Sequence, residues 1–235
     1  MKDGDVSSAV LSDLAAGSDI GFLYIYSYQG GVGDALASAI APMMGSTDGL
    51  IIDHRYNYGG LMSQSSPLLS QLLDEDIAGA VQCRTRLASG GYEELGPCPV
   101  GVTPESYIDI DPETFYSGPI ALLTGPNSVS AGDFVPFFLR RHPNVRVFGR
   151  ATSGEFGARD VPWGPDPILG DLWLALTYMF YLDDAGDPLL GSEQDPDEDV
   201  WLTREDVIAG RDTVLEAAAA WLEACLAEPT CPPTG

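Results

Sequence analysis

The feature that most constrains the fold is an alternation of short apolar runs with segments of helical periodicity. Three runs have the length of a buried strand, at residues 21–26, 50–53 and 119–124. A loop and then a helical pattern follow each of them, and the patterns at 61–73 and 130–141 are the clearest. Strands that alternate with helices in this way favour a parallel sheet with helices packed on its faces.

One core domain is expected over residues 21–225, because 235 residues suit a single domain of generous size. Residues 1–20 are predicted to be a polar lead-in with one short helix. Residues 226–235 are predicted to be a frayed tail after a final helix at 213–228. Between 78 and 118 the sequence changes to short strands, glycines and a proline-bearing stretch, which predicts a hairpin-like excursion from the core. No stretch approaches the roughly 20 apolar residues that a membrane span requires.

Acidic residues outnumber basic ones by 35 to 11, which gives a net charge of −24. Such a field disfavours nucleic acids and anionic membrane surfaces, since both bind through clustered lysines and arginines. Solubility is the simplest explanation of the charge, although the same field favours cationic substrates. Lys2 is the only lysine in the sequence, so a catalytic lysine from the folded core is excluded.

Four cysteines form two local pairs, Cys83 with Cys98 and Cys225 with Cys231, and each pair brackets a segment rich in turn residues. The spacing is not that of a zinc site, and the two histidines lie far off in the sequence. Two short-range disulfides are therefore predicted, which would indicate an exported protein, extracellular or periplasmic. The alternative is four free thiols, some of them buried as small apolar side chains. The first residues contain no apolar segment of the signal-peptide type.

The glycine loop, residues 54–60, follows the expected strand at 50–53 and ends in Gly59 and Gly60. Open α/β sheets place ligands at the carboxyl ends of their strands. Backbone amides that no Cβ covers approach a ligand closely, so this loop is a candidate cradle for an anion or an oxyanion. A tight turn into the next helix explains the glycines equally well.

The serine loop, residues 125–133, joins a buried strand to a helix and carries Ser130 followed by Ala131 and Gly132. A serine at a helix N-terminus is commonly just a cap. Here small residues leave space around the hydroxyl. The Ala131 amide and the positive end of the helix dipole would face a negative charge that develops beside it. The position therefore suits a nucleophile as well as a cap.

Taken together, these loops and several later segments resemble peptidase family S41, which includes the tail-specific proteases and the tricorn core protease. Five family signatures occur in family order across residues 21–225, and their joint order argues against chance similarity. They are D-x-R-x-N-x-G-G at 53–60, S/T-x-S-A-x-E/D at 128–133, V-x-G followed by T-x-G within 147–154, x-P-D-x-x-V at 195–200 and G-x-D-x-x-L-E-x-A at 210–218.

The resemblance implies an α/β fold, a ClpP/crotonase-like spiral core with a mixed, largely parallel sheet flanked by helices. It also implies a hydrolase, a serine-type peptidase without cofactor or metal that acts on peptide or protein substrates by acyl transfer. In that role Ser130 is the nucleophile. The amide of Ala131 and one amide of the pair Gly59 and Gly60 form the oxyanion hole.

The family's general base has no clear counterpart in this chain. Tail-specific members place a lysine directly after T-x-G, where this chain has Glu155. A carboxylate is a poor base for a serine hydroxyl unless burial raises its pKa. The tricorn branch uses a histidine from a preceding segment and a late acidic residue, which Asp195 matches approximately. His54, in the glycine loop, is a further candidate base, although packing or hydrogen bonding at the strand end is its simpler role.

Three hypotheses follow from these residues. In the first, the chain is a peptidase core whose base is supplied by sequence outside it. In the second, it is a catalytically inactive binding module for a peptide or an apolar ligand, because the same fold occurs in interphotoreceptor retinoid-binding protein. In the third, it has another crotonase-like activity such as that of a hydratase, against which the ordered signatures argue.

Overall fold

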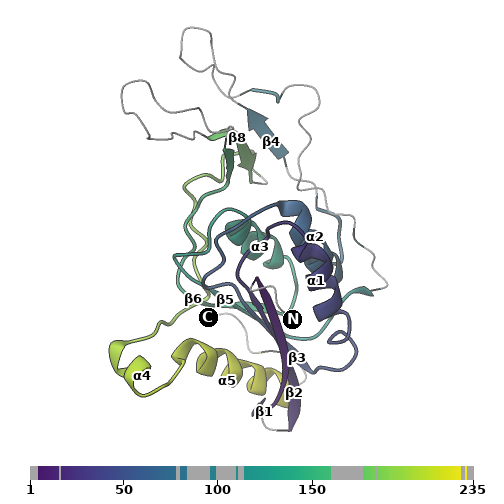
Figure 1. The fold of residues 1–235 in the computed structure, drawn as a ribbon, viewed down its shortest axis with the longest axis vertical. Coiled ribbons are helices and arrows are strands. Elements are labelled where there is room, and N and C mark those ends of the chain that lie inside the picture. The colour runs from purple at the N-terminus through teal and green to yellow at the C-terminus, as the bar shows by residue number, and fades with distance from the viewer. Residues whose placement is uncertain are drawn as a thin grey trace.

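The computed structural model describes residues 5–15, 17–77, 80–83, 96–98, 110, 114–159, 177–183, 185–228 and 231. These residues form a six-stranded sheet covered by helices and a separate three-stranded sheet (Figure 1). Of the helices in this part of the chain, none is both long and apolar enough to cross a membrane.

The six-stranded sheet is mostly parallel. Its strands are, in spatial order, β1 (Val6–Ala15), β2 (Ser18–Ile25), β3 (Gly49–Asp53), β5 (Ile120–Thr124), β6 (Val145–Gly149) and β9 (Glu198–Asp199). β1 is antiparallel to β2, and every other neighbouring pair is parallel. β3 and β5 are buried along their whole length, which explains why their sequences are continuous apolar runs. Because β2, β3, β5 and β6 are parallel, the loops after them gather at one edge of the sheet.

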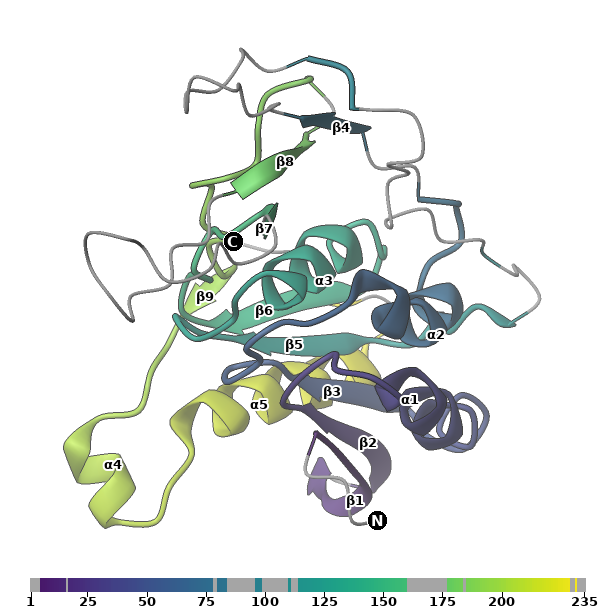
Figure 2. The same cartoon turned by 45° about the horizontal axis from the view of Figure 1, so that its top comes forward.

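Helices cover both faces of this sheet (Figure 2). Three of them lie on one face, and the long C-terminal helix lies on the other. The short helix before it has no buried residue and lies away from the sheet. The first three are α1 (Val32–Ile40), α2 (Met62–Leu72) and α3 (Ala131–Leu139), and the last two are α4 (Arg204–Ile208) and α5 (Thr213–Ala227).

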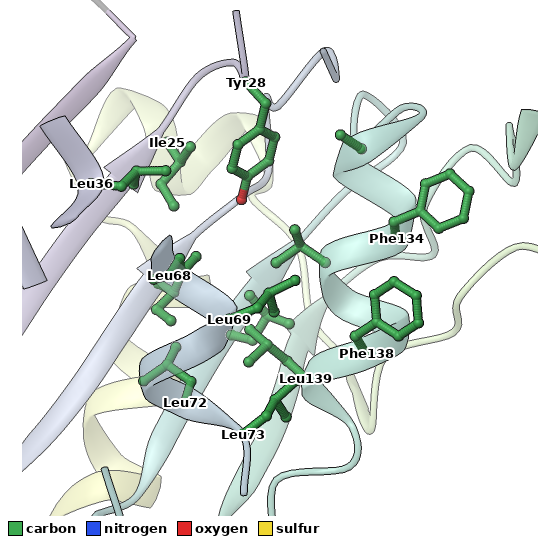
Figure 3. Close-up of a cluster of buried hydrophobic side chains, with 14 of the residues drawn as sticks. Ile25, Tyr28, Leu36, Leu68, Leu69, Leu72, Leu73, Phe134, Phe138 and Leu139 are labelled. Carbon is green, nitrogen blue, oxygen red and sulfur yellow. The ribbon is translucent and has the colours of Figure 1, made fainter. Parts of the chain in front are cut away.

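Each face of the sheet has its own apolar core. On the first face, side chains of α1, α2 and α3 meet, among them Leu36, Leu69 and Phe134 (Figure 3). On the other face α5 contributes Trp221, whose ring lies 5.9 Å from that of Phe148 in β6. The sheet is therefore held between two apolar layers, and the loops at its edge rest on a rigid support.

The smaller sheet is antiparallel, in the order β4 (Ala80–Cys83), β8 (Thr177–Leu182) and β7 (Gly157–Arg159). Cys83, at the end of β4, is disulfide-bonded to Cys98. A second disulfide joins Cys225 in α5 to Cys231. Both predicted pairings of the cysteines are thus present.

The predicted fold class and the final helix at 213–228 are confirmed. The short helix expected within 1–20 is wrong, because residues 6–15 form β1, which pairs antiparallel with β2. β1 is an edge strand with mostly exposed side chains, so its sequence lacks the alternation of a half-buried strand. The structure describes only part of the excursion expected at 78–118. This part includes β4 and two backbone hydrogen bonds between Cys83 and Gly96, and most of the remaining residues lie outside the described ones.

Candidate functional site

The glycine loop and the serine loop lie against each other at the carboxyl ends of β3 and β5. A Cβ atom placed on Gly59 would lie 2.5 Å from the carbonyl oxygen of Val129 and 2.8 Å from Cβ of Ser130. Only glycine allows this approach, and its φ of 87° also favours glycine. The N–H of Val129 donates to the carbonyl oxygen of Asn57 at 2.9 Å, which joins the two loops directly.

Two further contacts hold the loops together. The hydroxyl of Ser128 donates to the carbonyl oxygen of His54 at 2.8 Å. A Cβ atom on Gly132 would lie 2.6 Å from the carbonyl oxygen of Asn57, so a larger residue would push the loops apart. The small residues of the serine loop are therefore required by the close approach of the glycine loop.

Ser130 has an unusual backbone conformation. Its φ is 59° and its ψ is −116°, and among the described residues it is the only non-glycine residue with a positive φ. Such a conformation costs about 1–3 kcal/mol and persists only where surrounding contacts impose it. In α/β-hydrolases, a strained turn between a strand and a helix presents the nucleophilic serine in this way. Ser130 is half-buried, and α3 begins at the next residue.

Some backbone N–H groups around Ser130 are hydrogen-bonded within the protein, and others are left without an acceptor. The N–H of Gly59 donates to Oδ1 of Asn57 at 2.9 Å, so it is not available to a ligand. Within the described part of the chain, the N–H groups of Gly60 and Ala131 have no acceptor. Ala131 is the first residue of α3, so its N–H also lies at the positive end of the helix dipole. The two unused donors suit a ligand oxygen that carries negative charge.

Asp133, in the first turn of α3, binds the serine loop to the segment after β6. Its carboxylate accepts from the N–H of Ser130 at 2.7 Å, from that of Gly154 at 2.8 Å and from that of Glu155 at 3.1 Å. Burial raises the pKa of Asp133, and hydrogen bonds from Thr152, Gly154 and Ser130 offset only part of this effect. The backbone of Glu155 therefore lies beside Ser130, while the side chain of Glu155 is exposed.

His54 is fully buried and forms a 2.6 Å hydrogen bond through Nε2 with the hydroxyl of Tyr28, which is also fully buried. Its Nδ1 has no hydrogen-bond partner among the described groups. Burial lowers the pKa of His54 to about 3 despite an opposing interaction with the Gly132 backbone. No hydrogen bond joins His54 to Ser130 in the described part of the chain, and the observed role of His54 is hydrogen bonding at the strand end.

A buried ion pair anchors the other side of the glycine loop. Arg55 donates through Nε and Nη2 to the two oxygens of Asp53 at 3.0 and 2.7 Å. It also donates through Nη1 and Nη2 to the two oxygens of Asp212, both at 2.8 Å. Asp212 caps α5 by accepting from the N–H of Leu215. Burial alone would lower the pKa of Arg55, but the two carboxylates outweigh it and raise the pKa.

Asp195 lines a neighbouring pocket. This open pocket of about 630 Å³ also has Thr152 and Ser153 in its walls. Ser153 connects it to the site, because its hydroxyl donates to Asp133 at 3.2 Å. Among the described residues no hydrogen bond joins Asp195 to Ser130, and no group of three or more histidine, cysteine or acidic side chains is placed to hold a metal ion.

Tyr28, Asn57 and Asp133 belong to this site and were not given a role from the sequence. Asn57 and Asp133 stand inside the matched signatures, so the signal was present without an assigned function. Asn57 donates through Nδ2 to the carbonyl oxygen of Ile25 at 2.9 Å and accepts from the N–H of Gly59. It therefore sets the conformation of the glycine loop. No sequence signal indicated the bond between Tyr28 and the histidine of that loop.

The model of peptidase family S41 matches residues 19–200 of the chain. No curated protein sequence matches the chain significantly. Among solved structures, a protein from Parabacteroides merdae described as a candidate peptidase has 29% sequence identity and a TM-score of 0.72. That match covers 96% of this chain and 66% of the other.

Two solved structures of lower identity share the fold. Mature CPAF complexed with lactacystin has a TM-score of 0.69 and 19% identity, over 94% of this chain and 53% of the other. The photosystem II D1 C-terminal processing protease has a TM-score of 0.59 and 19% identity, over 97% of this chain and 54% of the other. The chain thus spans between 53% and 66% of the length of these three structures.

Proposed function

Because the chain belongs to peptidase family S41, we propose that it is the core of a serine-type peptidase in which Ser130 cleaves peptide bonds by acyl transfer. The observation that supports this most is the positive φ of Ser130 where it packs against Gly59. Ser130 is also the N-cap of α3 and forms a capping box with Asp133, but a serine that only caps a helix has extended dihedrals. The strained conformation is therefore better explained by a nucleophile than by a cap.

In this mechanism the hydroxyl oxygen of Ser130 attacks the carbonyl carbon of the scissile peptide, and its proton passes to a general base. The N–H groups of Gly60 and Ala131 donate to the oxygen that becomes negative, which is worth about 3 kcal/mol per donor in such sites. The base then protonates the leaving amine, and the C–N bond breaks. Water hydrolyses the resulting ester of Ser130 by the same steps, which releases the carboxylate product and restores the hydroxyl.

The general base in this proposal is a histidine supplied by sequence outside this chain. Among the described residues no histidine or carboxylate side chain is hydrogen-bonded to the hydroxyl of Ser130. His54 is fully buried and bonded to Tyr28, which argues against it as this base. Glu155, beside Asp133, and Asp195, in the neighbouring pocket, are proposed as carboxylates that orient the incoming base.

An exported location is part of the same proposal. Disulfides persist mainly in oxidising compartments, and the chain forms two of them, Cys83 with Cys98 and Cys225 with Cys231. The proposed substrate is a peptide or a protein, and cleavage near a C-terminus, as in the tail-specific branch, is the narrower expectation.

Labelling with a fluorophosphonate probe tests the proposal, because such probes phosphonylate activated serines. The chain is expressed with its natural flanking sequence, treated with the probe and analysed by mass spectrometry. We expect a modified Ser130 in the wild type and no modification in Ser130→Ala. The matched control is Ser192→Ala, which removes an exposed serine outside the site and should label like the wild type. A folded wild-type protein that is not labelled at Ser130 would show the proposal to be wrong.

A second candidate function is a binding module without turnover. One observation favours it: among the described residues, no side chain that could act as a base is hydrogen-bonded to the hydroxyl of Ser130. In that case peptides should raise the melting temperature of the wild type and of Ser130→Ala alike, and neither protein should cleave them. Hydrolysis that depends on Ser130 would exclude this function.

A further inference from the structure

Four tyrosines and a leucine gather on the outside of the protein next to the glycine loop. We define them as the tyrosine surface: Tyr24, Tyr26, Tyr56, Tyr58 and Leu61. The exposed fraction is 41% for Tyr26, 42% for Tyr56, 46% for Tyr58 and 49% for Leu61, whereas Tyr24 is half-buried. Single exposed apolar side chains are ordinary, but a contiguous group of large ones marks an interaction site.

Three rings of this surface contact one another in two pairs. Tyr24 and Tyr26 are stacked with ring centroids 6.5 Å apart, and Tyr26 meets Tyr58 edge to face at 4.9 Å. The N–H of Tyr58 donates to the carbonyl oxygen of Tyr26 at 3.1 Å, which holds the two segments together. The pKa of Tyr24 is raised, chiefly by burial and then by the nearby Asp53, Tyr26 and Tyr56, as expected for closely grouped phenols. Rings held in this way lose little conformational entropy when a partner binds.

The tyrosine surface adjoins the unused amide of Gly60. Tyr58 directly precedes Gly59, and Leu61 directly follows Gly60. The N–H of Leu61 donates to the carbonyl oxygen of Tyr28 at 2.9 Å, and a Cβ atom on Gly60 would lie 2.8 Å from Cα of Tyr28. The glycine loop is thus fixed to the strand segment that carries the tyrosines. A polypeptide whose carbonyl oxygen reached Gly60 would place neighbouring residues on the tyrosine surface.

The charge around this surface favours a cationic partner. The chain carries 35 acidic and 11 basic residues. Arg55, from the glycine loop, is buried between Asp53 and Asp212 and so offers little positive charge to the surface. Asp5 lies beside the tyrosines, where its carboxylate accepts from the hydroxyl of Ser27 at 2.8 Å. Ring faces attract lysine and arginine, and a negative field raises the local concentration of cations.

We propose that the tyrosine surface binds a basic segment of the polypeptide substrate beside the scissile bond. This inference rests on the proposed peptidase function and names the substrate class of that site. Arginine and lysine side chains lie across the tyrosine rings, with their aliphatic stems against Leu61. An acidic segment meets a field of its own sign and is rejected.

Peptide binding to the Ser130→Ala variant tests this inference without turnover. The probes are fluorescent glycine- and serine-rich peptides that differ only in carrying arginine, glutamine or glutamate. We expect the arginine peptide to bind most tightly, and Tyr26→Ala with Tyr58→Ala to weaken its binding about tenfold. Tyr26→Phe with Tyr58→Phe keeps the ring faces and should retain binding. The control is Val207→Ala with Ile208→Ala, which shortens exposed side chains of α4 and should change nothing.

Three results would overturn the inference. The first is equal binding of the three peptides. The second is unchanged binding of the arginine peptide after both alanine substitutions. The third is a loss of dimer mass in sedimentation on those substitutions, which would show that a second copy of the chain occupies the surface. The first result needs no tyrosine variant, so it stands even where the alanine variant fails to fold. Loss of probe labelling at Ser130 with intact peptide binding would refute only the peptidase function. If the probe still labels Ser130 but peptide binding does not depend on Tyr26 and Tyr58, only this inference would be refuted.

Discussion

Replacing the buried pair of His54 and Tyr28 should remove one component of the pH dependence of stability. The two side chains are fully buried and joined by a 2.6 Å hydrogen bond. The perturbation is His54→Leu with Tyr28→Phe, which replaces both polar partners and leaves no buried hydroxyl without a partner. The comparison of wild type and double variant then isolates the protonation of one imidazole.

The size of this pH-dependent loss of stability follows from the pKa of His54. It is about 3 in the folded protein, whereas an ordinary histidine has a pKa of about 6.5. Below pH 6.5 the unfolded chain binds a proton at His54 that the folded protein does not bind. The stability that His54 contributes is therefore fully present above its unfolded pKa and is lost as the pH falls toward 3. At pH 5, about 1.5 units below the unfolded pKa, the loss is about 2 kcal/mol.

Urea unfolding followed by tryptophan fluorescence measures this difference. We expect the free energy of unfolding of the wild type, relative to the double variant, to fall by about 2 kcal/mol between pH 7.5 and pH 5. Burial also lowers the pKa of His142, but His142 is present in both proteins and its contribution cancels. A constant difference between the two proteins over this range would refute the reasoning, because His54 would then titrate like an exposed histidine.

Three further substitutions test the contacts around the site. Gly59→Ala should abolish probe labelling and lower the free energy of unfolding by about 2 kcal/mol, because the new Cβ, at a φ of 87°, would collide with Val129 and Ser130. Labelling at the wild-type rate, measured by mass spectrometry, would contradict this. Arg55→Met should lower stability by about 3–5 kcal/mol in urea unfolding, since it leaves Asp53 buried without its partner, and a loss below about 1 kcal/mol would count against the buried ion pair. Asp133→Asn should slow labelling and lower stability by about 1–3 kcal/mol, because an amide cannot accept on both sides from the N–H groups that the carboxylate now binds; unchanged kinetics and stability would argue against this role.

The parts of the fold buried on both sides were predictable from the sequence. β3 and β5 are continuous apolar runs because helices cover both faces of the sheet. α2 has the periodicity of a helix with one buried face, whereas α3 is apolar along almost its whole length because nearly all of it is buried. β1 was missed because it is an edge strand with mostly exposed side chains, so burial imposes little pattern on it. Its place is set by backbone pairing to β2, which leaves no trace in side-chain identity.

The candidate site was predictable in its location and not in its details. Parallel strands bring their following loops to one edge, so an encounter of Gly59 with Ser130 was expected. The different availability of the Gly59 and Gly60 amides depends on where Oδ1 of Asn57 lies, which is a side-chain hydrogen bond without a sequence signal. His54 likewise depends on a tyrosine 26 residues earlier, and only the folded chain shows that the two side chains meet.

A crystal structure of the fluorophosphonate adduct tests most directly whether Ser130 and the unused amides form one catalytic site. We predict that the phosphonyl group is attached to the hydroxyl oxygen of Ser130. One of its oxygens should lie about 2.7–3.1 Å from the backbone nitrogens of both Gly60 and Ala131. An adduct oxygen that contacts neither nitrogen, or a modified serine other than Ser130, would contradict the proposed site.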